Sequence, residues 1–233
     1  MWQFVRGVEA LRDAALGFGT PVVSGNVSFY NETEGRAIPP TPAIAVLGVM
    51  PDVSLRVTQF FKQAGDLIAI VRTAPPSLAA SEYEAMYGLD GGALASIDLA
   101  REKALIEALV GSIEQGLIKS AHDVSEGGLL VAIAEACLNP AALLGAEVDL
   151  GVAASDAATL FGEGPSTVVL SFRSDGDSVR AEKMFSGRGL EFSRIGRVAD
   201  EPQLRVAGIV DQDVRELRAI YEDALPRRLK ASD

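Results

Sequence analysis

A cluster of prolines divides this chain more firmly than any other feature of its sequence. Three of the four residues 39–42 are proline, in the run RAIPPTP, and neither a helix nor a central strand continues through such a run. Before it, the sequence predicts one amphipathic helix over 2–16 and one strand over 21–33. One helix and one strand cannot form a buried hydrophobic core of their own. We therefore expect residues 1–40 to be the end of a larger domain or to pack on another chain.

Residues 41–233 carry strand and helix signals that do not follow a strict βαβ repeat. Residues 74–97 are rich in glycine and proline and are predicted to form a loop. Strands are predicted over 43–50, 66–73, 117–124, 146–150, 167–172, 192–199 and 203–208, and helices over 98–115, 126–138, 155–161, 178–186 and 212–224. This mixture favours an α+β fold, with helices on one face of a largely antiparallel or mixed sheet.

The composition excludes several classes of partner. The chain of 233 residues has a net charge of −11, which argues against nucleic acid or an anionic membrane as the main partner. No apolar run reaches the length of a membrane span. The single cysteine, Cys137, is expected to be a buried thiol in a reducing compartment, so we expect a cytoplasmic protein. The single histidine, His122, rules out a metal centre with several histidines.

The run PVVSGNVSFYNET, residues 21–33, combines strand-forming residues with polar ones. In a strand, Ser24, Asn26 and Ser28 would share one face, and Gly25 would leave room for a ligand to approach the backbone. The Asn26 carboxamide is a suitable oxygen ligand for Mg²⁺. The alternative is that these residues form the solvent-facing side of an edge strand.

A second candidate site lies in SAHDVSEGGLLVAIAEAC, residues 120–137. Ser125 is expected to cap the helix that follows, and Gly127 to lie in its first turn, where free backbone N–H groups can bind an anion. Asp123 or Glu126 would be able to hold a metal ion that bridges phosphates. The alternative is that Ser125 only caps the helix and the glycines only allow close packing. The sequence contains no P-loop motif.

A third stretch, LFGEGPSTVVLSF at residues 160–172, places Glu163 directly before a predicted strand. Two interpretations are open, a functional carboxylate or a solvated loop residue.

These stretches, together with PPTPAIAVLGVM (39–50), resemble phosphoribosylformylglycinamidine synthase, whose synthetase subunit belongs to the aminoimidazole ribonucleotide synthetase-like ATP-binding superfamily. The resemblance covers nearly the whole chain. It implies that residues 1–40 end an A-type domain and residues 41–233 form a B-type domain, as in the C-terminal third of that enzyme. The implied reaction is the ATP-dependent amidation of formylglycinamide ribonucleotide with ammonia derived from glutamine.

The resemblance also implies roles for individual residues. Gly25 would contact ATP, Asn26 would bind Mg²⁺, and Ser28 would contact the ribonucleotide substrate. No catalytic residue is expected in this chain, because the family's catalytic histidines and ATP-binding lysine belong to the N-terminal half. Asp123, Ser125 and Gly127 would form part of an auxiliary nucleotide site. At Gly164 the chain departs from the family, which commonly has serine there.

The implied partners are the N-terminal half of the same synthetase, a glutaminase subunit and a small accessory subunit. Two alternatives remain open. In the first, the chain belongs to another ATP-dependent synthetase of the superfamily, of the aminoimidazole ribonucleotide or selenophosphate type. It would otherwise be a non-catalytic module that packs against a catalytic partner.

Overall fold

A computed structural model describes residues 1–230 of the chain. The chain falls into two compact units that meet between Val53 and Ser54, and each unit is described by itself. The first contains helix α1 (Trp2–Phe18), which ends at Gly19 in the left-handed conformation. A hairpin of β1 (Glu32–Thr33) and β2 (Arg36–Ala37) follows. No residue of this unit is fully buried.

The strand predicted over 21–33 is confined to its last two residues, and the strand predicted over 43–50 is absent. Residues 20–29 have no regular secondary structure, and the apolar side chains of 43–50 are exposed, among them Val46 at 79% and Leu47 at 94%. A strand needs a neighbour for its backbone N–H and C=O groups. The hairpin supplies only two residues on each side, so strand-forming sequence alone does not produce a strand here.

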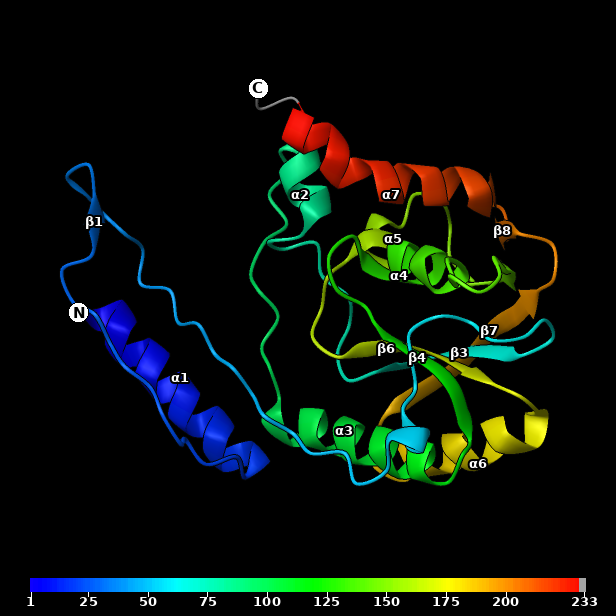
Figure 1. Cartoon of the computed structure of the whole chain (residues 1–233), viewed down its shortest axis with the longest axis horizontal. Helices are drawn as coiled ribbons and strands as arrows, with labels where there is room; N and C mark the ends of the chain where they lie inside the picture. Colours follow the sequence, from blue (N-terminus) through cyan, green and yellow to red (C-terminus); the bar gives the residue numbers. More distant parts are fainter. Residues whose placement is uncertain (231–233) are drawn as a thin grey trace. The chain divides into compact units, whose positions relative to one another are not determined.

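The second unit is built on one seven-stranded sheet (Figure 1). The strands are β3 (Leu67–Arg72), β4 (Ile118–Asp123), β5 (Gly145–Val148), β6 (Thr167–Phe172), β7 (Glu191–Ala199), β8 (Gln203–Val206) and β9 (Val210–Asp213). Their order across the sheet is β4-β6-β3-β7-β5-β8-β9. All neighbours are antiparallel except β5 and β8, which are parallel. The predicted α+β class with a mixed sheet is confirmed.

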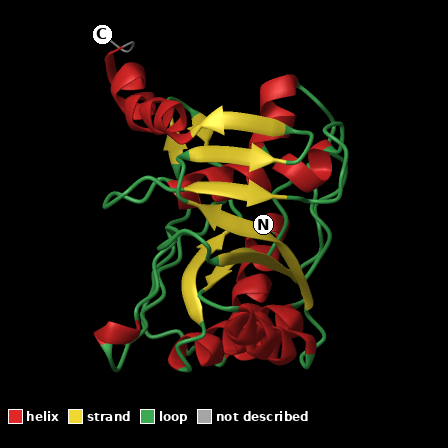
Figure 2. Cartoon of the chain, turned by 90° about the vertical axis from the view of Figure 1, so that its right-hand side faces the viewer, coloured by secondary structure: helices red, strands yellow, loops and turns green. Residues whose placement is uncertain are grey.

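Helices cover both faces of this sheet, where the sequence led us to expect one (Figure 2). The helices of the unit are α2 (Glu82–Tyr87), α3 (Leu99–Glu114), α4 (Gly128–Cys137), α5 (Ala157–Phe161), α6 (Asp175–Ser186) and α7 (Val214–Lys230), and a 3₁₀ turn spans Val53–Leu55. Helices α3 and α6 share one buried cluster with the sheet, while α4, α5 and α7 share the other.

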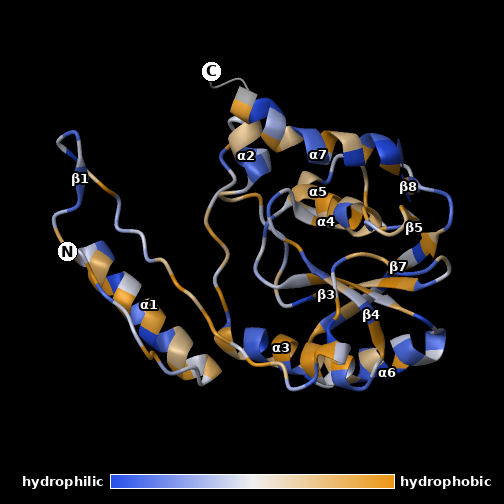
Figure 3. Ribbon diagram, in the orientation of Figure 1, coloured by the Kyte–Doolittle hydropathy of each residue, from blue (hydrophilic) through white to orange (hydrophobic). Residues whose placement is uncertain are grey.

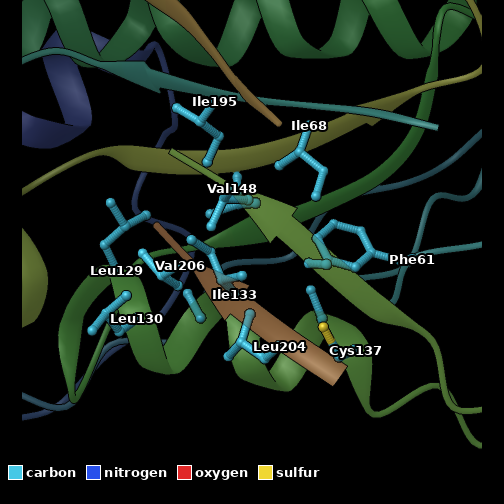
Figure 4. Close-up of a cluster of buried hydrophobic side chains, with 14 of the residues drawn as sticks. Phe61, Ile68, Leu129, Leu130, Ile133, Cys137, Val148, Ile195, Leu204 and Val206 are labelled. Atoms are coloured by element: carbon cyan, nitrogen blue, oxygen red, sulfur yellow. The ribbon is translucent and has the colours of Figure 1, made fainter. Parts of the chain in front are cut away.

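Strand β3 shows why two layers of helices are required. Its side chains alternate between the two clusters: Ile68 and Ile70 pack toward α4, and Leu67, Ala69 and Val71 pack toward α3 and α6. A strand that is apolar on both sides needs cover on both faces, and fully burying each isoleucine stabilises the fold by about 1.5–3 kcal/mol. Figure 4 shows the cluster that Ile68 shares with α4, and Figure 3 marks the hydropathy of each residue along the ribbon.

Candidate functional site

The polar run Gly25–Ser28 lies in the first unit, on the segment that follows α1. Gly25, Asn26 and Ser28 are all exposed, and a side chain added at Gly25 would meet no atom within 4 Å. The segment is held beside α1 by Phe29, whose ring lies 5.2 Å from that of Phe4. Because residues 21–29 are not a strand, the alternation that would place Ser24, Asn26 and Ser28 on one face is not formed within this unit.

The second candidate site is a loop of the second unit, between β4 and α4. Ser125 does not cap α4 as expected; its hydroxyl donates instead to the Asp123 carboxylate. That hydrogen bond is the main cause that lowers the pKa of Asp123. The residue before the helix is Gly127, which caps it without any side-chain hydrogen bond. Asp123 and Ser125 are thus brought together, but as a local turn on the surface.

The two glycines of this loop serve close packing, which is the alternative that the sequence left open. Gly127 and Gly128 both have positive φ, of 84° and 76°. A side chain at Gly128 would lie 2.4 Å from the backbone of Phe161, and one at Gly127 would lie 2.6 Å from Val131. Only glycine fits both the backbone angle and the space.

Glu163 joins this loop to two other segments and is not a freely solvated residue. Its Oε1 accepts hydrogen bonds of 2.8 Å from the backbone N–H of Gly127 and from that of Glu82. The carboxylate therefore takes the place that an anion would occupy beside Gly127. No local sequence signal pointed to this role, because both donors are distant in the chain.

Two buried groups lie on β4 and α4 behind the loop. His122 Nε2 lies 2.9 Å from Glu135 Oε2, and its Nδ1 is buried without a hydrogen-bond partner. Burial raises the pKa of the Cys137 thiol to about 12, which leaves almost no thiolate at neutral pH. The interpretation of Cys137 as a buried core thiol is confirmed. Within residues 1–230, acidic, His and Cys side chains nowhere gather in threes that could hold a metal ion.

Residues 63–209, more than half of the chain, match the family described as AIR synthase related protein, C-terminal domain. This chain belongs to the AIR synthase related family. The matched range contains the whole of six of the seven strands of the sheet, and it also contains the loop around Gly127. The resemblance to this superfamily that the sequence motifs indicated is therefore confirmed.

Curated relatives of this AIR synthase related chain are synthase subunits. It is 39% identical over 239 residues to "Phosphoribosylformylglycinamidine synthase subunit PurL" of Anaeromyxobacter sp. (strain Fw109-5), an alignment covering 99% of this chain and 31% of that protein. It is 40% identical over 231 residues to the subunit of the same name from Thermobifida fusca. That alignment covers 97% of this chain and 29% of that protein. The chain thus spans about a third of the length of these relatives.

Solved structures share the fold of this chain. "T. maritima PurL complexed with ATP" superposes with a TM-score of 0.55 at 22% identity, covering 70% of this chain and 27% of that one. "T. maritima PurL complexed with FGAR" gives a TM-score of 0.56 at 22% identity, covering 71% and 30%. At this identity the likeness shows the fold alone. None of the helices within residues 1–230 has the length and apolar character needed to span a membrane.

Proposed function

We propose that this chain is the C-terminal portion of a phosphoribosylformylglycinamidine synthase synthetase subunit. The observation that carries the proposal is the alignment with the PurL relatives over 99% of the chain, which takes in the first unit as well as the sheet domain. In the proposed reaction, ATP phosphorylates the amide oxygen of formylglycinamide ribonucleotide, and ammonia then displaces the phosphate. The chain alone is expected to be inactive.

In this proposal, residues 1–40 end an A-type domain, and residues 41–233 are a B-type domain. The absence of any fully buried residue within 1–53 supports a first part that needs further protein to bury its apolar side chains, although the compact units divide between Val53 and Ser54 and not at residue 40. Exposed apolar side chains such as Val23 at 91% and Leu47 at 94% favour burial against protein outside this unit. The N-terminal half of the same synthetase would supply that protein.

The proposed contribution of this chain to the reaction is the polar run Gly25–Ser28. Gly25 would lie against ATP, as the family resemblance implies, and its backbone is exposed. Asn26 is exposed, and its carboxamide oxygen would serve as a ligand to Mg²⁺, which neutralises phosphate charge when bound. Ser28 would donate a hydrogen bond to the ribonucleotide. The auxiliary nucleotide site at Asp123, Ser125 and Gly127 stays a prediction.

The proposed partners are a glutaminase subunit, which would supply ammonia, and a small accessory subunit. One solved structure with this fold is titled "Structure of PurLQS from Thermotoga maritima", with a TM-score of 0.52 at 22% identity. That title supports an assembly of several subunits for the protein it describes, and we extend the expectation to this chain.

The proposal is tested by Asn26→Ala in the intact synthetase polypeptide, with Asn31→Ala as the matched control. We expect Asn26→Ala to lower kcat by at least about tenfold and to raise the Mg²⁺ concentration needed for half-maximal rate, because an oxygen ligand is lost. Asn31→Ala, five residues along the same segment, should leave both nearly unchanged. Activity and Mg²⁺ dependence at wild-type levels in Asn26→Ala would refute the assignment.

A further inference from the structure

A hollow of about 480 Å³ opens on the side of the sheet where Ile70 and Ile195 pack toward α4. Its wall is made by the end of β3, the start of β7 and the segment that follows β5. Arg72, the last residue of β3, pairs directly with Glu191, the first residue of β7. Pockets of about 300–1,000 Å³ are the size that holds small molecules. We call this feature the Arg72 hollow.

The Arg72 guanidinium lacks the partners that such a group normally has. Its Nε is buried and has no hydrogen-bond partner, although buried donors are nearly always bonded. Asp156 lies near enough for Arg72 to help lower its pKa, but no hydrogen bond or ion pair joins the Arg72 side chain to any of residues 1–230. A planar guanidinium with free donors is the group best suited to bind a carboxylate through two hydrogen bonds.

The other charges of the Arg72 hollow restrict the ligand. Asp149 and Glu191 line it and are exposed. The second arginine on the wall, Arg194, is already engaged, since its Nε donates to Ser178 and its Nη2 to Glu182. One arginine without a hydrogen-bonded partner thus shares the hollow with two carboxylates, of which Asp149 already accepts the N–H of Gly151, and it also attracts the nearby Asp156. A phosphate or another plain anion would be repelled by these carboxylates, whereas a ligand that carries both an ammonium and a carboxylate would match them.

The rest of the wall is apolar. It indicates which kind of group on the ligand accompanies the ammonium and the carboxylate. Ile70 and Ile195 form its buried floor, and Leu150 and Val152 are half-buried beside it. These side chains favour an apolar group on the ligand, because burying one against them removes apolar surface from water.

We propose that the Arg72 hollow binds a free amino acid with an apolar side chain. Its carboxylate lies on the Arg72 guanidinium, its ammonium lies on Glu191 and Asp149, and its side chain packs on Ile70 and Ile195. The hollow is formed by residues of the second unit alone, and the proposal does not depend on the proposed synthase activity. Binding there would make the B-type domain responsive to an amino acid.

The ligand class is tested by isothermal titration calorimetry on the 233-residue chain. The probes are L-leucine, L-methionine and L-phenylalanine, each against two matched analogues: the amide, which lacks the carboxylate, and the 2-oxo acid, which lacks the ammonium. We expect at least one amino acid to bind and both of its analogues to bind at least about tenfold more weakly, since each loses a charge-assisted contact. Equal binding of the amide or of the 2-oxo acid would overturn the proposal, as would no binding by any amino acid.

Two variants locate the site. Arg72→Gln and Glu191→Gln should each weaken binding of the amino acid by at least about tenfold, while Arg215→Gln, an exposed arginine at the start of α7, should not. Circular dichroism and the melting temperature establish that each variant is folded. Should Arg72→Gln fail to fold, Arg72→Lys keeps the charge but not the planar fork, and it should still weaken binding. Unchanged affinity in folded Glu191→Gln would place the ligand elsewhere and refute the proposal.

Discussion

The Glu163 carboxylate accepts a hydrogen bond of 2.8 Å from the backbone N–H of Gly127, which lies 36 residues earlier in the chain. The same oxygen accepts the N–H of Glu82, 81 residues earlier. One side chain between α5 and β6 therefore joins the beginnings of α2 and α4. Carboxylates favour helix N-termini because backbone N–H groups there lack partners within the helix.

Glu163→Ala should therefore destabilise the sheet domain. Two backbone donors would lose a charged acceptor, and we expect the free energy of unfolding to fall by at least about 2 kcal/mol. Urea denaturation followed by circular dichroism measures the change. Glu126→Ala is the matched control, because Glu126 lies in the same loop and is exposed; its effect should stay within about 0.5 kcal/mol. Equal effects of the two variants would show that Glu163 is solvated rather than structural.

Gly128→Ala should lower the free energy of unfolding by more than the strain of a positive φ alone would. The added methyl group would lie 2.4 Å from the Phe161 carbonyl carbon, so the helix and the end of α5 would have to separate. Gly116 has a similar φ of 67° but nothing within 4 Å, and Gly116→Ala should cost only the about 1–2 kcal/mol of a left-handed alanine.

The steric clash at Gly128 is measured by how much more Gly128→Ala lowers the free energy of unfolding than Gly116→Ala does. We expect this difference to be at least about 1 kcal/mol. Thermal and urea unfolding of both proteins measure it. An equal loss of stability in Gly116→Ala and Gly128→Ala would mean that α4 and α5 do not meet as closely as described.

Asp66 should make the domain less stable as the pH rises. Its side chain is 2% exposed with Oδ2 unpartnered, and burial raises its pKa above the ordinary value of 3.8. A carboxyl group with a raised pKa holds its proton more tightly in the folded state than in the unfolded state. The stability linked to it is thus fully present below pH 3.8 and is lost as the pH rises through the folded pKa.

Asp66→Asn removes this ionisation and should be more stable than the native chain at pH 7, with the advantage shrinking toward pH 4. Asp123→Asn is the opposite case, because the hydrogen bond from Ser125 lowers the pKa of Asp123; this variant should lose stability at pH 7 and less at low pH. Urea unfolding at a series of pH values measures both. The same sign of pH dependence in the two variants would contradict this account.

The sheet domain was largely predictable because strands such as β3 and β6 are buried on both faces and because the apolar residues of its longer helices recur at helical spacing. The runs over 66–73 and 167–172 match β3 and β6 almost residue for residue. Helix α2 was missed because it has only six residues within a loop-rich segment. A signal for it was present: Ser81 accepts the N–H of Glu84, a capping pattern readable as serine followed three residues later by glutamate. Strand β9 was missed because three of its four residues are polar.

The sites were less predictable than the fold, for a physical reason. Sequence reports the tendency of 21–33 and 43–50 to form strands, but not whether a neighbouring strand exists, and both segments are mostly irregular here. A role predicted from one stretch of sequence also leaves out hydrogen-bond partners that come from distant segments. Ser125 was expected to bond to the helix and bonds to Asp123 instead, while Glu163 satisfies the Gly127 N–H from a distant loop.

The central claim is that Gly25–Ser28 helps to hold magnesium nucleotide and ribonucleotide against residues encoded elsewhere. A crystal structure of the intact synthetase polypeptide with a non-hydrolysable ATP analogue, Mg²⁺ and formylglycinamide ribonucleotide tests it most directly. We predict the Asn26 carboxamide oxygen at about 2.0–2.1 Å from Mg²⁺, the distance that this ion requires, with Gly25 beside the nucleotide. A structure in which Asn26 faces solvent, with no phosphate or metal ion near it, would contradict the account.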